Sequence, residues 1–330
     1  MARYGGEMGE LANKSAPGAG STAGDTPDIE AILKDALAKG DRALSGVTPV
    51  LTHLLANTGD SLVSDAIVAR IRGMLSDISA QLVLAARTED DPVAEQSLDR
   101  FAEELHEDSA VLSHCYALAV EGYLGERFEQ RAKIDQVLTP LLQELIASDQ
   151  PAVGELAMEC MAAQSRFVQS QRRMQLPLGE LPAELFFAIL RRWENHCRRF
   201  ELAIEEASYQ SLRQRYDEGT SRMGQFARLV SAMRGGIHAA LDLKHAGLAL
   251  FASAVSAATR QPRELAVLAC HERQTARLAL TLRAANLDAD AIEKQILLVE
   301  SAERLPSGLE TISPQRASAL LGHATTDQVI

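Results

Sequence analysis

Apolar residues recur every three or four positions through most of the chain, which is the spacing of neighbours on one face of an α-helix. The pattern is clearest on either side of residues 175–182. The stretch before them has one apolar face made of Val153, Leu156, Cys160, Ala163, Phe167 and Met174. The stretch after them has one made of Phe186, Ile189, Trp193, Cys197, Phe200 and Ile204. Each stretch predicts an amphipathic helix with one buried face.

Prolines set the limits of these two helices. Pro177 cannot continue a helix and restrains the residue before it, so the first helix should end near Met174. Pro182 suits the first turn of the next helix, where its missing N–H costs nothing. We expect the apolar residues of the connection to lie over the helix ends; they are Leu176, Leu178 and Leu181. The two helices are therefore predicted to fold back on each other as an antiparallel pair.

The same period predicts further helices along the rest of the chain. They cover about 26–40, 62–86, 92–104, 109–124, 127–147, 221–233, 237–258, 263–285 and 288–302. The helical pattern that begins near Pro182 is expected to continue past Phe200 to about Tyr216. Gly40 should end the first of them, and Pro140 should bend or split the helix over 127–147. Asn286 is expected as a C-terminal cap and Asp288 as an N-cap. Ser313 and Pro314 should open a short final helix.

These elements predict an all-α fold, an irregular array of antiparallel helical hairpins in one or two contacting lobes. Aromatic residues make up only 4% of the chain, which also favours helix over sheet. We expect a disordered tail over 1–25, because it is rich in Gly, Ala and Ser. The remaining regions are an N-terminal helical region over 26–150, a central and C-terminal one over 151–304, and a linker, short helix and tail over 305–330.

Composition narrows the classes of function. The net charge of −12 argues against binding to nucleic acid, because the chain would repel a phosphate backbone. The four cysteines are far apart and form no CxxC pair, which fits a reducing cytoplasm better than a zinc clip or a disulfide framework. The longest uncharged run, 246–259, is too short to span a membrane. The N-terminus lacks an apolar signal core, so no export is expected.

Seven arginines create a locally basic zone around the central pair of helices. They are Arg166, Arg172, Arg173, Arg191, Arg192, Arg198 and Arg199. Arginines in such a run are usually solvated helix faces paired with scattered carboxylates. The alternative is a docking surface for an acidic protein partner.

The run AAQSRFVQSQRRMQLPLGELPAELFFAIL, from Ala162 to Leu190, resembles a signature of a bacterial, mostly alphaproteobacterial, family of unknown function. The run ARLALTLRAANL, from Ala276 to Leu287, is similar to a second segment of that family. The resemblance implies an all-helical intracellular protein. It implies no activity, because that family has no established catalytic residues to carry over.

One short motif indicates possible phosphotransfer chemistry. His271, Glu272 and Thr275 match the H-E-x-x-T box of histidine phosphotransfer domains, in which the histidine is phosphorylated and the residue four places on shares its helix face. The chain departs from that pattern, since no proline follows the box and no Gly-rich ATP-binding segment is present. A histidine between helices is the plainer interpretation.

A second cluster could hold a metal ion. His238, Asp242 and His245 are four and three residues apart, so they would share one face of the helix predicted over 237–258. One helix rarely supplies a complete metal site, and Asp242 could instead pair with a neighbouring side chain.

The leading hypothesis is a non-catalytic cytoplasmic interaction or regulatory protein, acting as an adaptor or scaffold through the surfaces around the central pair. No cofactor is expected. Homodimerisation could use the long helix predicted over 62–86. The alternatives are a phosphotransfer component that uses His271 and a metal- or ligand-binding helical enzyme.

Overall fold

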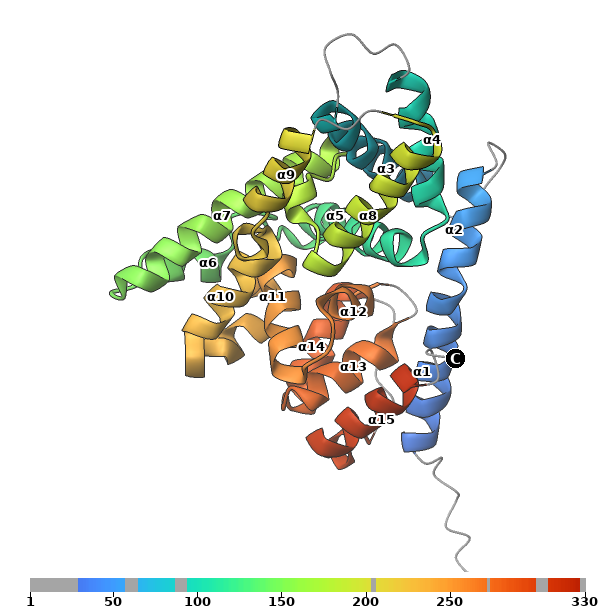
Figure 1. The fold of residues 1–330 in the computed structure, drawn as a ribbon. Coiled ribbons are helices and arrows are strands. Elements are labelled where there is room, and N and C mark those ends of the chain that lie inside the picture. The colour runs from blue at the N-terminus through green and yellow to red at the C-terminus, as the bar shows by residue number, and fades with distance from the viewer. Residues whose placement is uncertain are drawn as a thin grey trace, which may run out of the picture.

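The computed structural model describes residues 29–56, 65–86, 94–202, 206–271, 274–300 and 308–326. Helices are the only regular secondary structure in these ranges (Figure 1), which confirms the all-α prediction. The α-helices of the first half are α1 (Ile29–Ser45), α2 (Val47–Ala56), α3 (Asp65–Ala86), α4 (Ala94–His106), α5 (Ser109–Ala132), α6 (Pro140–Ile146) and α7 (Pro151–Arg172). Those of the second half are α8 (Ala183–Arg199), α9 (Glu206–Arg215), α10 (Arg222–Met233), α11 (Leu243–Thr259), α12 (Arg263–Ala269), α13 (Thr275–Ala284), α14 (Ala289–Val299) and α15 (Pro314–Thr326). Short 3₁₀ helices are η1 (Leu178–Glu180), η2 (Glu218–Thr220), η3 (Arg234–Leu241) and η4 (Leu309–Thr311).

Helix α5 lies at the centre of the fold. It contacts α2, α3, α4, α7, α11, α12 and α14, and most of its residues are buried, as expected of a helix that is apolar nearly all round. Asp108 caps its N-terminus by accepting hydrogen bonds from the backbone N–H groups of Ala110 and Val111. The predicted break near residue 125 is wrong, because the helix continues to Ala132. Gly125 instead permits a close approach, since a Cβ there would lie 2.8 Å from Gln136 Oε1.

The connection between α7 and α8 is confirmed as a break in the helical chain, and its leucines are buried. Leu176, Leu178 and Leu181 expose 2%, 5% and 0% of their surfaces. Two side chains of α3 hold the connection. The N–H of Leu176 donates to Asp77 Oδ2 at 2.9 Å, and the N–H of Leu178 donates to Gln81 Oε1 at 3.0 Å.

The predicted antiparallel pair of α7 and α8 is not formed. Helix α7 packs against α6 and α10, whereas α8 lies on α4, where the rings of Trp193 and Phe101 are 4.9 Å apart. The cause lies in the connection, which crosses α3 instead of turning back on α7. Gly73 of α3 permits this crossing, because a side chain at that position would clash with Met174. The two apolar faces therefore meet different partners.

Helices α1 and α2 form a strap along one edge of the molecule (Figure 1). Helix α1 contacts α13 and α15, while α2 contacts α3 and α5. The predicted helix end at Gly40 is wrong, because α1 continues to Ser45. Gly40 is buried and its carbonyl oxygen accepts a hydrogen bond of 2.9 Å from Gln274 Nε2, so the absence of a side chain serves packing.

One cluster of buried apolar residues runs from Leu33 to Leu321 and is continuous across residue 150. The apolar stripe of α3 belongs to it, since Ile71, Leu75 and Ile78 are fully buried inside the molecule. That stripe is therefore not available as the homodimer surface proposed for 62–86. Within the described ranges, no helix is both long and apolar enough to cross a membrane. The tail predicted over 1–25 lies outside the described residues.

Candidate functional site

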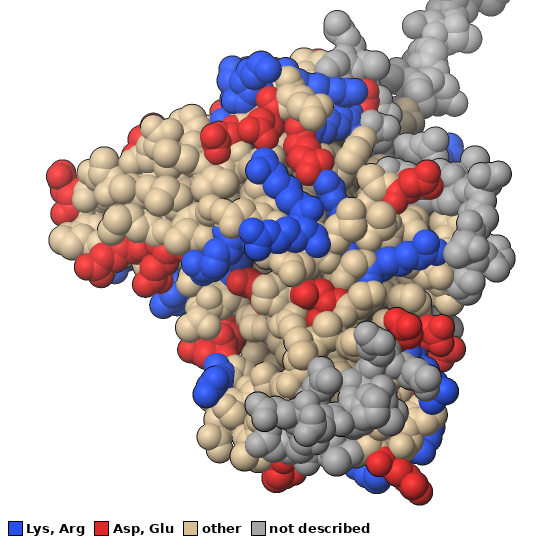
Figure 2. Space-filling model, turned by 90° about the horizontal axis from the view of Figure 1, so that it is seen from above, with Lys and Arg blue, Asp and Glu red and all other residues tan. Residues whose placement is uncertain are grey.

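The seven arginines named in the sequence differ in their contacts. Figure 2 shows basic side chains in bands across one face of the molecule, with acidic side chains close beside them. Two of the seven are held by ion pairs to neighbouring helices. Arg192 Nη2 lies 2.6 Å from Asp108 Oδ2, and Arg199 Nη1 lies 3.0 Å from Glu104 Oε1. These two arginines hold α8 against α4 and the start of α5.

The other exposed arginines of α7 and α8 differ in their contacts. Arg198 donates to Asn195 Oδ1 of its own helix at 3.0 Å. Arg172 and Arg191 are exposed. Arg166 and Arg173, seven residues apart, are the two that the structure brings together, because both line one pocket.

This pocket has a volume of about 330 Å³ and lies between the end of α7, the connection and the start of α10. Between its two arginines, neutral polar side chains from α7 and the connection line it, including Gln169, Ser170 and Gln175. Arg166 and Arg173 are exposed and have no acidic partner among the residues that the structure describes. We call this feature the arginine pocket.

One carboxylate, Glu180, also lines the arginine pocket, but it already has a partner. Its Oε2 accepts a hydrogen bond of 2.8 Å from the backbone N–H of Arg222, the first residue of α10. A carboxylate at a helix N-terminus is stabilised by the unpaired N–H groups there. The carboxylate of Glu180 thus holds α10 against the connection between α7 and α8. Arg166 and Arg173 are left to bind an acidic ligand.

Arg222, which also lines the arginine pocket, belongs to a buried ion triad. Glu121 of α5 accepts from Arg222 through both oxygens, with Nη1–Oε1 at 2.6 Å and Nη2–Oε2 at 2.8 Å. Arg263 of α12 approaches the same carboxylate at 2.8 Å and 2.6 Å. The guanidinium of Arg222 also lies over the ring of Phe167, 3.7 Å from its centroid, as in a cation–π contact.

Charge pairing keeps this buried carboxylate ionised. Burial alone would raise the pKa of Glu121, but the charges of Arg222 and Arg263 and their hydrogen bonds outweigh it and hold that pKa well below its ordinary range. The triad joins α5, α10 and α12 and so fixes the α10 side of the arginine pocket. The sequence analysis missed it, although Glu121 in the apolar run YALAVEGYL is a visible signal, because a lone charge in a buried helix needs a partner.

The predicted phosphotransfer box is not on one helix. Helix α12 ends at Ala269 and α13 begins at Thr275, so His271 lies in the turn between them. The single helix predicted over 263–285 is therefore wrong, and His271 and Thr275 do not share a helical face. Glu272 lies outside the described residues.

The predicted metal face is also broken. His238 lies in η3, and Asp242 has an extended backbone with φ −101° and ψ 109° between η3 and α11. The side chain of Asp242 caps α11 by accepting from the N–H groups of Lys244 and His245. The ring of His245 turns to Glu144, with Nε2 3.0 Å from Oε1. The described residues contain no group of three or more side chains arranged to hold a metal ion.

The fold and the arginine pocket thus define an all-helical protein with a compact basic recess on an acidic chain. Comparisons with protein-family profiles, with curated proteins and with solved structures gave no match for this chain.

Proposed function

We propose that the protein is a non-catalytic cytoplasmic interaction protein that binds an acidic segment of a partner protein at the arginine pocket. The observation that carries this proposal is the position of Arg166 and Arg173 at one recess without acidic partners in the described chain. Exposed arginines at a recess can bind a carboxylate through two parallel hydrogen bonds.

The surroundings of the pocket favour a partner with a short acidic segment over a long polyanion. The chain carries a net charge of −12, so it repels a long polyanion such as nucleic acid at a distance. A short acidic segment needs only the two guanidinium groups and the neutral polar rim of the pocket. The triad holds Arg222, which lines the α10 side of the pocket, in place, and this reduces the ordering cost of binding.

A fluorescent oligo-glutamate peptide tests the proposal, with an oligo-glutamine peptide of equal length for comparison. The double variant Arg166→Gln/Arg173→Gln should bind oligo-glutamate about tenfold more weakly or worse, because it loses two charge-assisted contacts. Added salt should weaken binding to the wild-type protein. Fluorescence anisotropy gives the affinities.

The matched control is Arg131→Gln/Arg215→Gln, which removes the same charge from two exposed arginines outside the pocket. It should retain the wild-type affinity. An equal loss in both double variants would mean that net charge alone governs binding, and equal binding of the two peptides would exclude an acid-specific site.

A further inference from the structure

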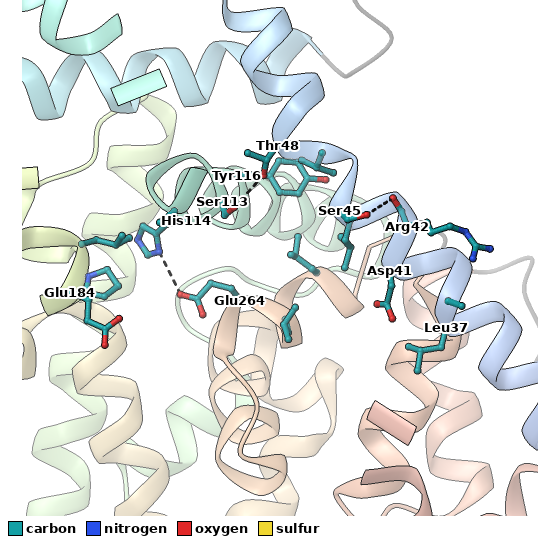
Figure 3. Close-up of a pocket in the computed structure, with 18 of the residues that line it drawn as sticks. Leu37, Asp41, Arg42, Ser45, Thr48, Ser113, His114, Tyr116, Glu184 and Glu264 are labelled. Atoms are coloured by element: carbon teal, nitrogen blue, oxygen red, sulfur yellow. Dashed lines mark hydrogen bonds and ion pairs between the residues drawn. The ribbon is translucent and has the colours of Figure 1, made fainter. Parts of the chain in front are cut away.

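A large cavity lies under the strap and shares no lining residue with the arginine pocket. It measures about 1230 Å³ and is lined by α1 and α2, the start of α5, the start of α8, and α12 and α15. The strap is attached at both ends, at α13 and α15 through α1 and at α3 and α5 through α2. The joint between α1 and α2 therefore spans an open space, which we call the strap cleft (Figure 3).

Aliphatic side chains form much of the wall of the strap cleft. They come from the strap, from α8, from α12 and from α15, and include Leu37, Leu44, Leu185, Leu265, Leu268 and Leu320. A concave site of this kind, with a few polar groups among apolar ones, is typical of small-molecule binding. The body of an occupant should accordingly be aliphatic.

The polar groups at one end are arranged around a carboxylate. Figure 3 shows His114 and Glu264 facing each other at this end, with Glu184 on the same side. His114 exposes only 4% of its side chain and its Nδ1 lies 3.5 Å from Glu264 Oε1, while Glu264 exposes 33% of its side chain. Nε2 of His114 has no hydrogen-bond partner in the described residues, so the imidazole is oriented by Glu264.

Two carboxylates, Glu264 and Glu184, lie at this end of the strap cleft. The hydrogen bond from His114 is the main reason that the pKa of Glu264 lies below its ordinary value, although burial opposes it, so the carboxylate is ionised at neutral pH. Glu184 is exposed and adds a second carboxylate. The basic residue Arg42 lies at the opposite end of the view in Figure 3 and does not neutralise this pair.

The remaining charged groups of the strap cleft are paired within the protein. Asp41 forms an ion pair with Arg277 of α13. Lys34 lies 2.7 Å from Glu30 one turn earlier in α1. Neither pair supplies a free positive charge to the end that holds Glu264.

From this complementarity we infer that the strap cleft binds a small amphiphilic amine, with its ammonium group at Glu264 and Glu184 and its aliphatic chain along the leucines. Glu264 accepts the ammonium protons, and His114 acts as a positioning residue that holds the carboxylate. The site is separate from the arginine pocket, and the two proposals stand or fall independently.

Titration calorimetry with octylamine, octanoate and octanol tests the inference, since these probes share one chain and differ in head group. Octylamine should bind at a single site, and octanoate should bind about tenfold more weakly or not at all, because two carboxylates repel it. Octanol should fall between them. No binding of octylamine, or equal binding of octylamine and octanoate, would overturn the inference.

Two variants test whether the probes bind in the strap cleft. Glu264→Gln should weaken octylamine about tenfold and leave octanol nearly unchanged. Ala110→Trp, at an exposed position of α5 one turn before His114, should block all three probes by filling the cleft. Glu155→Gln, an exposed carboxylate on α7, is the control and should bind as the wild-type protein does.

Thermal unfolding shows whether each variant is folded. If folded Glu264→Gln and folded Ala110→Trp both bind octylamine with wild-type affinity, the inference is wrong.

Discussion

Glu121 and Arg222 form a bidentate ion pair across 101 residues of sequence, with both side chains almost fully buried at 3% and 2% exposure. Arg263 pairs with the same carboxylate from a third helix. Two arginines around one carboxylate leave a net positive charge in the interior, so every hydrogen bond to that carboxylate matters for stability.

Glu121→Gln should lower the free energy of unfolding by about 3 kcal/mol or more, because two buried guanidinium groups lose their counter-charge. Urea unfolding followed by circular dichroism measures the change. The control is Glu159→Gln, which breaks an exposed pair with Arg228 that also reaches α10 and in which each side chain exposes 51%. That control should change stability by less than about 1 kcal/mol. Equal losses would show that burial does not set the strength of these pairs.

The same carboxylate predicts a pH dependence. Its pKa is lower in the folded protein than its ordinary value of 4.5, so its contribution is complete above that value and declines as the pH falls. The reason is that, as the pH falls below that value, the unfolded chain binds a proton at Glu121 while the carboxylate of the folded triad stays ionised. The stability difference between wild type and Glu121→Gln should narrow by about 1.4 kcal/mol per pH unit below that value. A difference that stays constant between about pH 6 and pH 3 would contradict this assignment.

Gly247 should not tolerate a side chain. Its backbone has φ 71° and ψ 163°, a conformation that is almost confined to glycine, and a Cβ would clash with the methyl group of Thr139. Gly247→Ala should therefore cost about 2 to 4 kcal/mol from the backbone and the clash together. Gly179→Ala is the control, because nothing lies within 4 Å of its added Cβ. Thermal unfolding compares them, and equal melting temperatures would refute the assigned conformation.

The cysteines should be unreactive while the protein is folded. All four are free thiols and buried, and burial raises the pKa of Cys115, Cys160, Cys197 and Cys270 to about 12. The thiolate is the reactive form, so Ellman's reagent at about pH 8 should release little colour from the native protein and a full four equivalents after denaturation. Rapid reaction of one thiol in the native protein would place that cysteine at an opening in the core.

Local rules predicted the features that depend on neighbouring residues. The break after α7 follows from Pro177, and Asp288 accepts from the N–H of Ala291 as a cap. Pro140 was expected to bend or split the helix over 127–147, and α6 begins at that residue. Asn286 has φ 70°, as a left-handed C-terminal cap requires. These contacts reach only a few residues along the chain, so the sequence contains the information directly.

The sequence analysis missed or wrongly predicted features that depend on residues far apart in the chain. Gly40 was predicted to end a helix, but it is the point where Gln274 approaches α1, and a glycine looks the same in the sequence in both roles. Pairing with scattered carboxylates was expected for the arginines of α8, but the sequence does not show that the partners of Arg192 and Arg199 are Asp108 and Glu104, more than 80 residues away. The triad and the strap cleft likewise assemble from helices that are far apart in sequence.

The strap has a consequence for biosynthesis. Arg316 of α15 donates from Nε to Glu30 Oε2 of α1 at 3.0 Å, across 286 positions of sequence. Because a ribosome makes α1 long before α15, the docking face of α1 stays incomplete through most of translation. Closing so large a loop is slow compared with forming local helices, so this end of the protein should be the last to mature.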